Sequence, residues 1–188
     1  MCPPASRSKT ELVALRVTKL DPAIHDRGAF SCGNDAVDMY LRSTAAQAAR
    51  YYRAASFVLE RADDSRQVLG FYTLAQHEYR DAELNDITMR ALKVRGLKRI
   101  PMVLLGQLGI STDWKGRGLG RYLLQDALRR SLAVAQEIGA VAMIADPVDD
   151  NARAFYAAFD FQLLHEAPFV RLLLPMRTIA RALTAKTS

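Results

Sequence analysis

The segment that begins at residue 115 combines glycines with cations in a pattern that suits an anionic ligand. It consists of Lys115, Gly116, Arg117, Gly118, Leu119, Gly120 and Arg121. An apolar run at residues 100–105 precedes it, and a helical pattern at residues 122–138 follows it. Glycine lets backbone N–H groups approach a ligand closely, and the N-terminus of a helix carries partial positive charge. The sequence therefore predicts a strand, a turn that binds a diphosphate, and a helix.

Two common phosphate-binding motifs do not match this turn. The P-loop needs a Gly-Lys pair followed by Ser or Thr, and the dinucleotide fingerprint needs a glycine where Arg121 stands. The run from Lys115 to Gly120 instead has the form Lys-x-x-Gly-x-Gly. It resembles the acetyl-coenzyme A signature of the GNAT acetyltransferase family, Arg/Gln-x-x-Gly-x-Gly/Ala. Lys115 departs from the family's Arg or Gln but keeps hydrogen-bond donors at that position.

Residues 149–161 form a second segment that resembles the same family. They match its Ala-x-x-Phe-Tyr-x-x-x-Gly-Phe block, with Tyr156 as the tyrosine and Asp160 in place of the glycine. On a helix, Tyr156 would lie at the edge of an apolar face, where packing is the commoner role for an arbitrary tyrosine. Asp149 stands where many relatives have an asparagine that contacts the coenzyme. The two motifs occur in the family's order, each after a predicted strand, and together they indicate an acetyltransferase.

Hydrophobic periodicity predicts an α/β (α+β) chain in which one sheet is flanked by helices. The expected strands are residues 12–17, 55–61, 68–77, 100–111, 140–145, 161–165 and 169–174. The expected helices are residues 35–51, 84–92, 118–138 and 151–159, with a helical tail from residue 175. The strand at 100–111 is apolar on both faces, so it should be central and parallel to the strand at 140–145. With the resemblance, this gives the GNAT fold: a central mixed twisted sheet of about six to seven strands, with strands 4 and 5 parallel and splayed.

Length and composition indicate one domain with an anionic partner. Residues 1–10 are expected to form a flexible leader, and residues 11–188 a single domain. No uncharged run is long enough for a membrane helix and no apolar signal core is present, so a cytoplasmic location is expected. The formal net charge of +6 favours a phosphate-bearing partner. Cys2 and Cys32 are too few for a disulfide framework, and no His/Cys/Asp spacing indicates a metal site.

A run of cations lies between the third and fourth predicted strands. It consists of Arg90, Lys93, Arg95, Lys98 and Arg99, with no acidic residue among them. Such a run usually forms a solvated loop, but it can also contact the phosphate backbone of a nucleic acid. Composition alone leaves both interpretations open.

Several further stretches are similar to the acetyltransferase toxins of bacterial toxin–antitoxin modules. Residues 105–110, Leu-Gly-Gln-Leu-Gly-Ile, resemble their Leu-Gly-Arg-Leu-Ala-Val run, with Gln107 in place of arginine. Residues 114–120, 154–156 and 174–178 resemble other blocks of these toxins. The resemblance implies that acetyl-coenzyme A is the donor, that no metal takes part, and that the acceptor is the α-amine of an aminoacyl-tRNA. It also implies a ribbon-helix-helix antitoxin and a homodimer.

The resemblance assigns roles to individual residues. Tyr156 is the expected general acid, which protonates the leaving thiolate. The expected coenzyme contacts are Leu108, Gly109, Ile110, Lys115, Gly116, Arg117, Gly118, Leu119, Gly120, Arg121 and Asn151. The cations at residues 90–99 become the expected tRNA contact. Direct attack is expected because an α-amine, with a pKa of about 7.7–8.0, is partly neutral at cellular pH.

Two other functions remain open at this point. One is a GNAT enzyme that acetylates a small-molecule amine or a protein amine, although a small-amine enzyme would more often present acidic groups to its acceptor. The other is a non-catalytic module that binds acyl-coenzyme A or nucleic acid, and the presence of Tyr156 argues against it.

Overall fold

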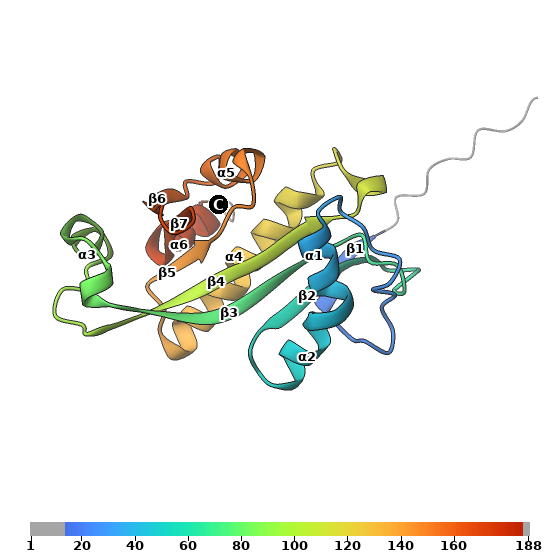
Figure 1. Ribbon diagram of the computed structural model, residues 1–188, viewed down its shortest axis with the longest axis horizontal. Helices are drawn as coiled ribbons and strands as arrows, with labels where there is room; N and C mark the ends of the chain where they lie inside the picture. The colour runs from blue at the N-terminus through green and yellow to red at the C-terminus, as the bar shows by residue number, and fades with distance from the viewer. Residues whose placement is uncertain (1–13, 186–188) are drawn as a thin grey trace, which may run out of the picture.

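The computed structural model describes residues 14–185, and its centre is a seven-stranded sheet (Figure 1). The strands are β1 (Leu15–Lys19), β2 (Ala55–Arg61), β3 (Gly70–Arg80), β4 (Arg99–Ile110), β5 (Ala142–Ala145), β6 (Gln162–His165) and β7 (Arg171–Pro175). Their spatial order is β1-β2-β3-β4-β5-β7-β6. β4 and β5 are parallel, and every other neighbouring pair is antiparallel. The predicted mixed sheet is confirmed, whereas the predicted leader at residues 1–10 lies outside the described residues.

Helices pack on both faces of this sheet. They are α1 (Asp35–Met39), the π-helical segment η1 (Tyr40–Thr44), α2 (Ala45–Arg50), the 3₁₀ turns η2 (Asp81–Glu83) and η3 (Thr112–Trp114), α3 (Asp86–Leu92), α4 (Leu119–Ile138), α5 (Asp150–Ala157) and α6 (Met176–Thr184). Figure 1 shows α1 and α2 in front of the sheet and α4 behind it. Alternate side chains of each strand point to opposite faces, so each central strand contributes to two cores.

The larger core lies between the sheet and α4. Leu105 of β4, Leu124 of α4 and Tyr156 of α5 belong to it. On the other face, Leu41 packs with Phe71 beneath the α1–α2 segment, and Ile100 packs with Leu92 of α3. The two faces are thus both closed around β3 and β4, which makes these strands the rigid support of the site described below.

β4 and β5 separate part way along their length. β5 pairs with β4 only from Met102 to Leu105, although β4 continues to Ile110. A bulge at this level also bends the strand pair, because Gly106 and Gln107 of β4 lie opposite the single residue Thr73 of β3. β5 ends at Ala145, and Pro147 soon after it has no N–H with which to continue the ladder. The resulting wedge between the two strands, called the opening below, is the predicted splay of strands 4 and 5.

The structure shifts several predicted boundaries. β1 is Leu15–Lys19 rather than 12–17, and residues 12 and 13 lie outside the described residues. β3 extends to Arg80 rather than residue 77, because its last residues pair with the start of β4. The predicted helix at 35–51 has a central turn of π-helix, which periodicity alone does not reveal.

Candidate active site

The glycines of the turn before α4 have backbone conformations that other residues rarely adopt. Gly116 and Gly118 have φ angles of 75° and 77°. A Cβ on either would meet no atom within 4 Å, so glycine is required here for its backbone and not for space. Gly118 is the N-cap of α4, and no side chain caps this helix. The N–H groups of the first turn of α4 therefore have no partner within the helix and can bind an anion.

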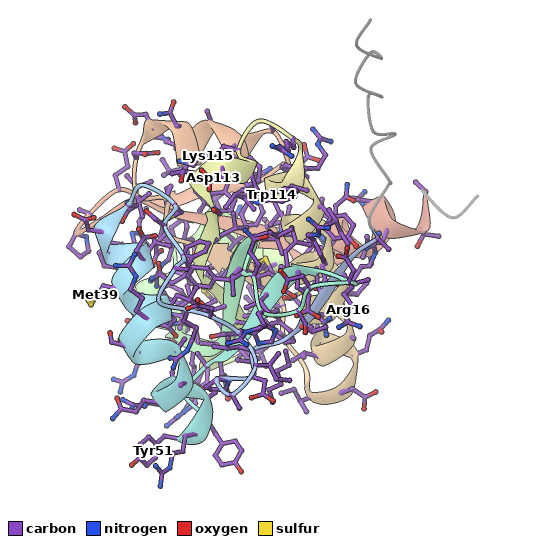
Figure 2. All side chains as sticks on the ribbon, turned by 90° about the vertical axis from the view of Figure 1, so that its right-hand side faces the viewer. Arg16, Met39, Tyr51, Asp113, Trp114 and Lys115 are labelled. Atoms are coloured by element: carbon purple, nitrogen blue, oxygen red, sulfur yellow. The ribbon has the colours of Figure 1, made fainter. Side chains whose placement is uncertain are left out.

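Cations surround this uncapped helix start. Arg117 lies over the Trp114 ring at 4.6 Å, and Arg121 lies over the Phe159 ring at 5.0 Å. Aromatic stacking holds both guanidinium groups near the turn while leaving their charges in place. Figure 2 labels Trp114 and Lys115 together at one end of the molecule. The turn thus combines free N–H donors with three positive charges, as the sequence predicted for a diphosphate site.

The end of β4 offers further backbone donors to the opening. The N–H of Gln107 donates to Thr73 Oγ1 at 2.9 Å, on the β3 side. Because backbone groups alternate in direction along a strand, the N–H groups of Leu108 and Ile110 face the opposite side, where β5 has already ended. An N–H facing the opening can bind a carbonyl oxygen that gains negative charge.

Gly109 lets α1 approach β4 closely. A Cβ at Gly109 would lie 3.1 Å from Val37 Cγ1 and 3.2 Å from Cys32 Sγ, which is tighter than ordinary contact. Cys32 is buried there, and burial together with a hydrogen bond to Asp38 raises the pKa of its thiol to about 11. A thiol with that pKa is almost wholly protonated at neutral pH, so Cys32 packs against the site and does not serve as a nucleophile.

Tyr156 is the most deeply buried side chain of α5, only 6% exposed. The sequence placed it at the edge of an apolar face, whereas the structure packs it between Phe155 and Phe161, with ring centroids 5.4 and 5.3 Å away. No described residue hydrogen-bonds to its hydroxyl, which is unusual for a buried tyrosine. Burial, and then the charge of Asp146, raise the pKa of Tyr156 above its ordinary value. The hydroxyl therefore keeps its proton throughout the physiological range.

The start of α5 is capped by its own side chain. The Asp149 carboxylate accepts a hydrogen bond from the Ala152 N–H at 2.7 Å and caps the helix. Asn151 lies exposed in the first turn. Asp160 has a φ angle of 65°, so it does adopt the left-handed conformation that glycine has in the family motif.

A network of polar side chains, which sequence reasoning missed, crosses the sheet beside Asp146. Arg171 donates two hydrogen bonds to the Asp146 carboxylate, both at 2.6 Å. Its third nitrogen donates to the Tyr79 hydroxyl at 3.1 Å and lies 3.2 Å from His77 Nε2. The Tyr79 hydroxyl lies 3.1 Å from His165 Nε2. The only signal in the sequence was one arginine inside the apolar run at 169–174.

This network keeps charges ordered next to the opening. Its salt bridge holds Asp146 at the end of β5, where its charge acts on Tyr156. Burial and the positive charge of Arg171 lower the pKa of His77, so the imidazole is neutral at pH 7. His77 is only partly buried, and its Nε2 is the atom that faces the Arg171 guanidinium.

The cationic run occupies a different part of the molecule. Arg90, Lys93, Arg95, Lys98 and Arg99 are all exposed. They lie on α3 and the turn before β4, at the end of β4 opposite the opening (Figure 1). Arg90 and Arg99 have acidic neighbours at 3.9 and 3.1 Å, Asp86 and Glu78. The structure thus does not bring the run together with the diphosphate turn.

These parts together define an acyltransferase that uses a coenzyme thioester. The turn suits a diphosphate, the end of β4 offers N–H donors to a thioester carbonyl, and the protonated Tyr156 hydroxyl lies on α5, the helix that follows β5. The model of the GNAT acetyltransferase family matches residues 34–161, and the chain belongs to this family. The protein is therefore an acetyltransferase.

Several proteins that this chain resembles are toxins. A tRNA-acetylating toxin of Mycobacterium tuberculosis is 35% identical over 158 residues, which cover 84% of this chain and 90% of that protein. AtaT complexed with acetyl-methionyl-tRNAfMet is 26% identical with a TM-score of 0.80, over 90% of this chain and 99% of that one. A tyrosine-to-phenylalanine mutant of AtaT bound to the C-terminus of the antitoxin AtaR is 25% identical with a TM-score of 0.77, over 91% and 98%.

Two other kinds of feature are absent from residues 14–185. No group of three or more His, Cys, Asp or Glu side chains in this range is arranged to hold a metal ion. No helix in this range is both long and apolar enough to cross a membrane.

Proposed function

We propose that this protein transfers the acetyl group of acetyl-coenzyme A to the α-amine of an aminoacyl-tRNA. The acetylated amine cannot attack in peptide-bond formation, so translation stops and the protein acts as a toxin. The observation that carries the proposal is the opening itself, where β5 ends and β4 continues. The uncapped start of α4 would hold the diphosphate, and Tyr156 on α5, the helix that follows β5, would supply the proton. The similarity to a tRNA-acetylating toxin over most of the chain supports the acceptor.

The residues of the turn fit acetyl-coenzyme A as the donor. Its diphosphate would be held by the first-turn N–H groups of α4 and by Lys115, Arg117 and Arg121. The arm of the coenzyme that carries the thioester would then run through the opening. There the thioester carbonyl would accept a hydrogen bond from the Leu108 N–H. Donors fixed in a strand stabilise the developing oxyanion without first having to reorient.

The proposed reaction is a direct attack. The neutral α-amine attacks the thioester carbon, and a tetrahedral intermediate forms with its oxygen held at β4. Collapse of this intermediate breaks the carbon–sulfur bond and expels the thiolate of coenzyme A, while the amine nitrogen loses a proton. No acetylated enzyme is needed, which agrees with the protonated state of Cys32.

Tyr156 supplies the proton that the thiolate receives. The raised pKa of Tyr156 keeps the hydroxyl protonated but also makes it a weaker acid than a thiol, whose ordinary pKa is about 8.5. Full transfer therefore requires the hydroxyl to regain a proton from the attacking amine in the same step. Tyr156 is thus a proton relay from the attacking amine to the leaving thiolate. Removing its hydroxyl oxygen should therefore slow the chemical step.

The cationic run supports a polymeric acceptor. Arg99 and Leu108 are separated by nine residues of β4, or about 30 Å at 3.3 Å per residue. A small amine bound at the opening could not reach cations that far away, whereas the acceptor arm of a tRNA could. We propose that Arg90, Lys93, Arg95, Lys98 and Arg99 contact the tRNA phosphates.

Acetylation of purified charged tRNA by the free chain tests this function. We expect acetyl transfer to aminoacyl-tRNA, and none to uncharged tRNA. The triple variant Lys93→Ala, Arg95→Ala, Lys98→Ala should lower kcat/KM for charged tRNA by about tenfold or more and reduce its salt dependence. Rates with a free amino-acid amide should not change. Faster acetylation of small amines or lysine peptides than of charged tRNA would overturn the proposal.

The remaining partners follow from the same proposal. Because AtaT binds the C-terminus of the antitoxin AtaR, we propose that a ribbon-helix-helix antitoxin neutralises this protein. We also propose that the protein works as a homodimer in the cytoplasm, where charged tRNA is found.

A further inference from the structure

A groove of about 570 Å³ lies at the end of the molecule away from the diphosphate turn. It runs between the end of α2, the start of β2 and the last turns of α4. Its floor includes Phe57, Leu74 and Val103, and its α4 side includes Val134 and Ile138. Most of the lining side chains are apolar, so the groove can bury an apolar partner.

An unpaired strand edge lies along this groove. The last pair between β2 and β3 joins Ala55 to Leu74, yet β3 continues to Arg80, and among residues 14–185 only β4 pairs with this continuation. Ala75 and Gln76, the first residues beyond β2, line the groove. Alternate backbone N–H and C=O groups of this stretch face away from β4, where an added strand could bond to them.

The charges around the groove are of one sign. Lys19, Arg53 and Arg130 line it, and none of its described lining residues is acidic. Arg130 is partly neutralised by Asp126 at 2.8 Å, whereas Lys19 and Arg53 are exposed and have no acidic partner within the described residues. The field at the groove therefore favours an acidic segment.

Large apolar groups at the rim are left in solvent. Tyr52 is 96% exposed and has a φ angle of 55°, a conformation that a bulky residue rarely adopts. Ile138 is 75% exposed at the end of α4. Binding surfaces typically combine strained backbone with solvent-exposed apolar side chains, and both occur at this groove.

We propose that this groove binds an extended, acidic, alternately apolar peptide segment, which adds as a strand to the free edge of β3. The proposal rests on the proposed function, because the antitoxin is the partner that would supply the segment. A second copy that paired through the same groove is disfavoured, since it would bring Lys19, Arg53 and Arg130 of one protomer against the same cations of its partner. RNA is disfavoured because the floor is apolar and the strand edge suits a peptide backbone.

The groove is remote from the donor site. It meets α4 at its last turns, whereas the diphosphate turn meets α4 at its first, about 30 Å away. Figure 2 shows the same separation, with Tyr51 at the end of α2 and Lys115 at the opposite end of the molecule. A segment bound in the groove would leave the donor site open.

Hydrogen exchange on the full chain, alone and with the antitoxin encoded beside it, tests the proposal. We expect the complex to slow exchange of the β3 amides from Ala75 to Arg80. The double variant Lys19→Glu, Arg53→Glu and the single variant Val134→Glu should each weaken antitoxin binding by about tenfold or more. Matched controls are Arg66→Glu with Arg129→Glu, and Val148→Glu, which change exposed residues outside the groove.

Each other outcome points to a different conclusion. Protection elsewhere, or equal effects of groove and control variants, would overturn the proposal. So would loss of tRNA affinity in the charge-reversed variant, which would indicate RNA, or conversion of a dimer to a monomer by Val134→Glu, which would indicate a second copy. Acetylation of charged tRNA by the free variants should equal that of the unmodified chain. Failure of the unmodified chain in that assay would instead contradict the proposed function.

Discussion

Two helices begin beside the opening, and they begin in opposite ways. α4 starts at Gly118, with no side-chain cap and no acidic residue in its first turn. α5 starts at Asp149, whose carboxylate binds the first-turn Ala152 N–H, and Asp150 follows it. A carboxylate already occupies the positive end of α5, whereas the positive end of α4 is free for a ligand. An anionic ligand can therefore bind at the start of α4 and not at the start of α5, the helix that carries Tyr156.

The largest effect should come from the α5 side. Tyr156→Phe removes the only proton donor that this helix places at the opening, while the apolar packing around the ring is kept. We expect turnover to fall by about a hundredfold or more, with the Kd for coenzyme A unchanged. Thiol release and calorimetric titration measure the two quantities. Equal turnover of the variant and the unmodified chain would contradict the assigned role of Tyr156.

The next largest effect should come from a substitution at the start of α4, where the diphosphate is proposed to bind. Gly118→Ala forces a Cβ onto a left-handed backbone at the start of the helix, so the first-turn N–H groups must move. The Kd for coenzyme A should rise by about tenfold, and the free energy of unfolding should fall by about 1–2 kcal/mol.

Gly96→Ala is the matched control for this substitution. Gly96 has a φ angle of 89° and equally open surroundings, but it lies in the turn before β4. Its substitution should lower stability to a similar degree and leave coenzyme A binding intact. If both variants lost binding equally, the defect would be one of folding and not of the diphosphate site.

The pH dependence of turnover gives a third test. The rate should rise with pH as the acceptor α-amine loses its proton, at a pKa of about 7.7–8.0. Because burial raises the pKa of Tyr156 above its ordinary value of 10.0, the relay proton stays in place and the rate should not fall before pH 10. A stopped-flow profile from pH 6 to 10.5 measures this. A fall in rate near pH 8 to 9 would show that a different group supplies the proton.

The smallest effect concerns the cap of α5. Asp149→Ala removes the acceptor of the Ala152 N–H bond and should lower the free energy of unfolding by about 1 kcal/mol. Asp149→Asn keeps a capping oxygen but removes a negative charge from the opening. It should preserve stability and tighten coenzyme A binding by about twofold to threefold. Denaturant unfolding and titration separate the two effects, and weaker binding by the asparagine variant would contradict the assigned cap.

Local chemistry made much of the fold readable in advance. The apolar run from Ile100, the glycine turn and the periodic helix after it were each visible because their signals span only a few residues. The predicted strand boundaries were wrong where pairing with another strand decides them, as at the end of β3.

The sequence by itself therefore determined the strand–turn–helix for which a diphosphate site is proposed, because such a turn needs only neighbouring residues. Tertiary structure alone decided what surrounds it. Tyr156 is buried because Phe161 and the sheet close over it, and Arg171 reaches Asp146 and Tyr79 only because β7 lies between β5 and β6. The groove beside β3 exists because the pairing of β2 with β3 stops at Leu74, six residues before β3 ends at Arg80. Such features depend on which strands become neighbours, and that information is spread over the whole chain.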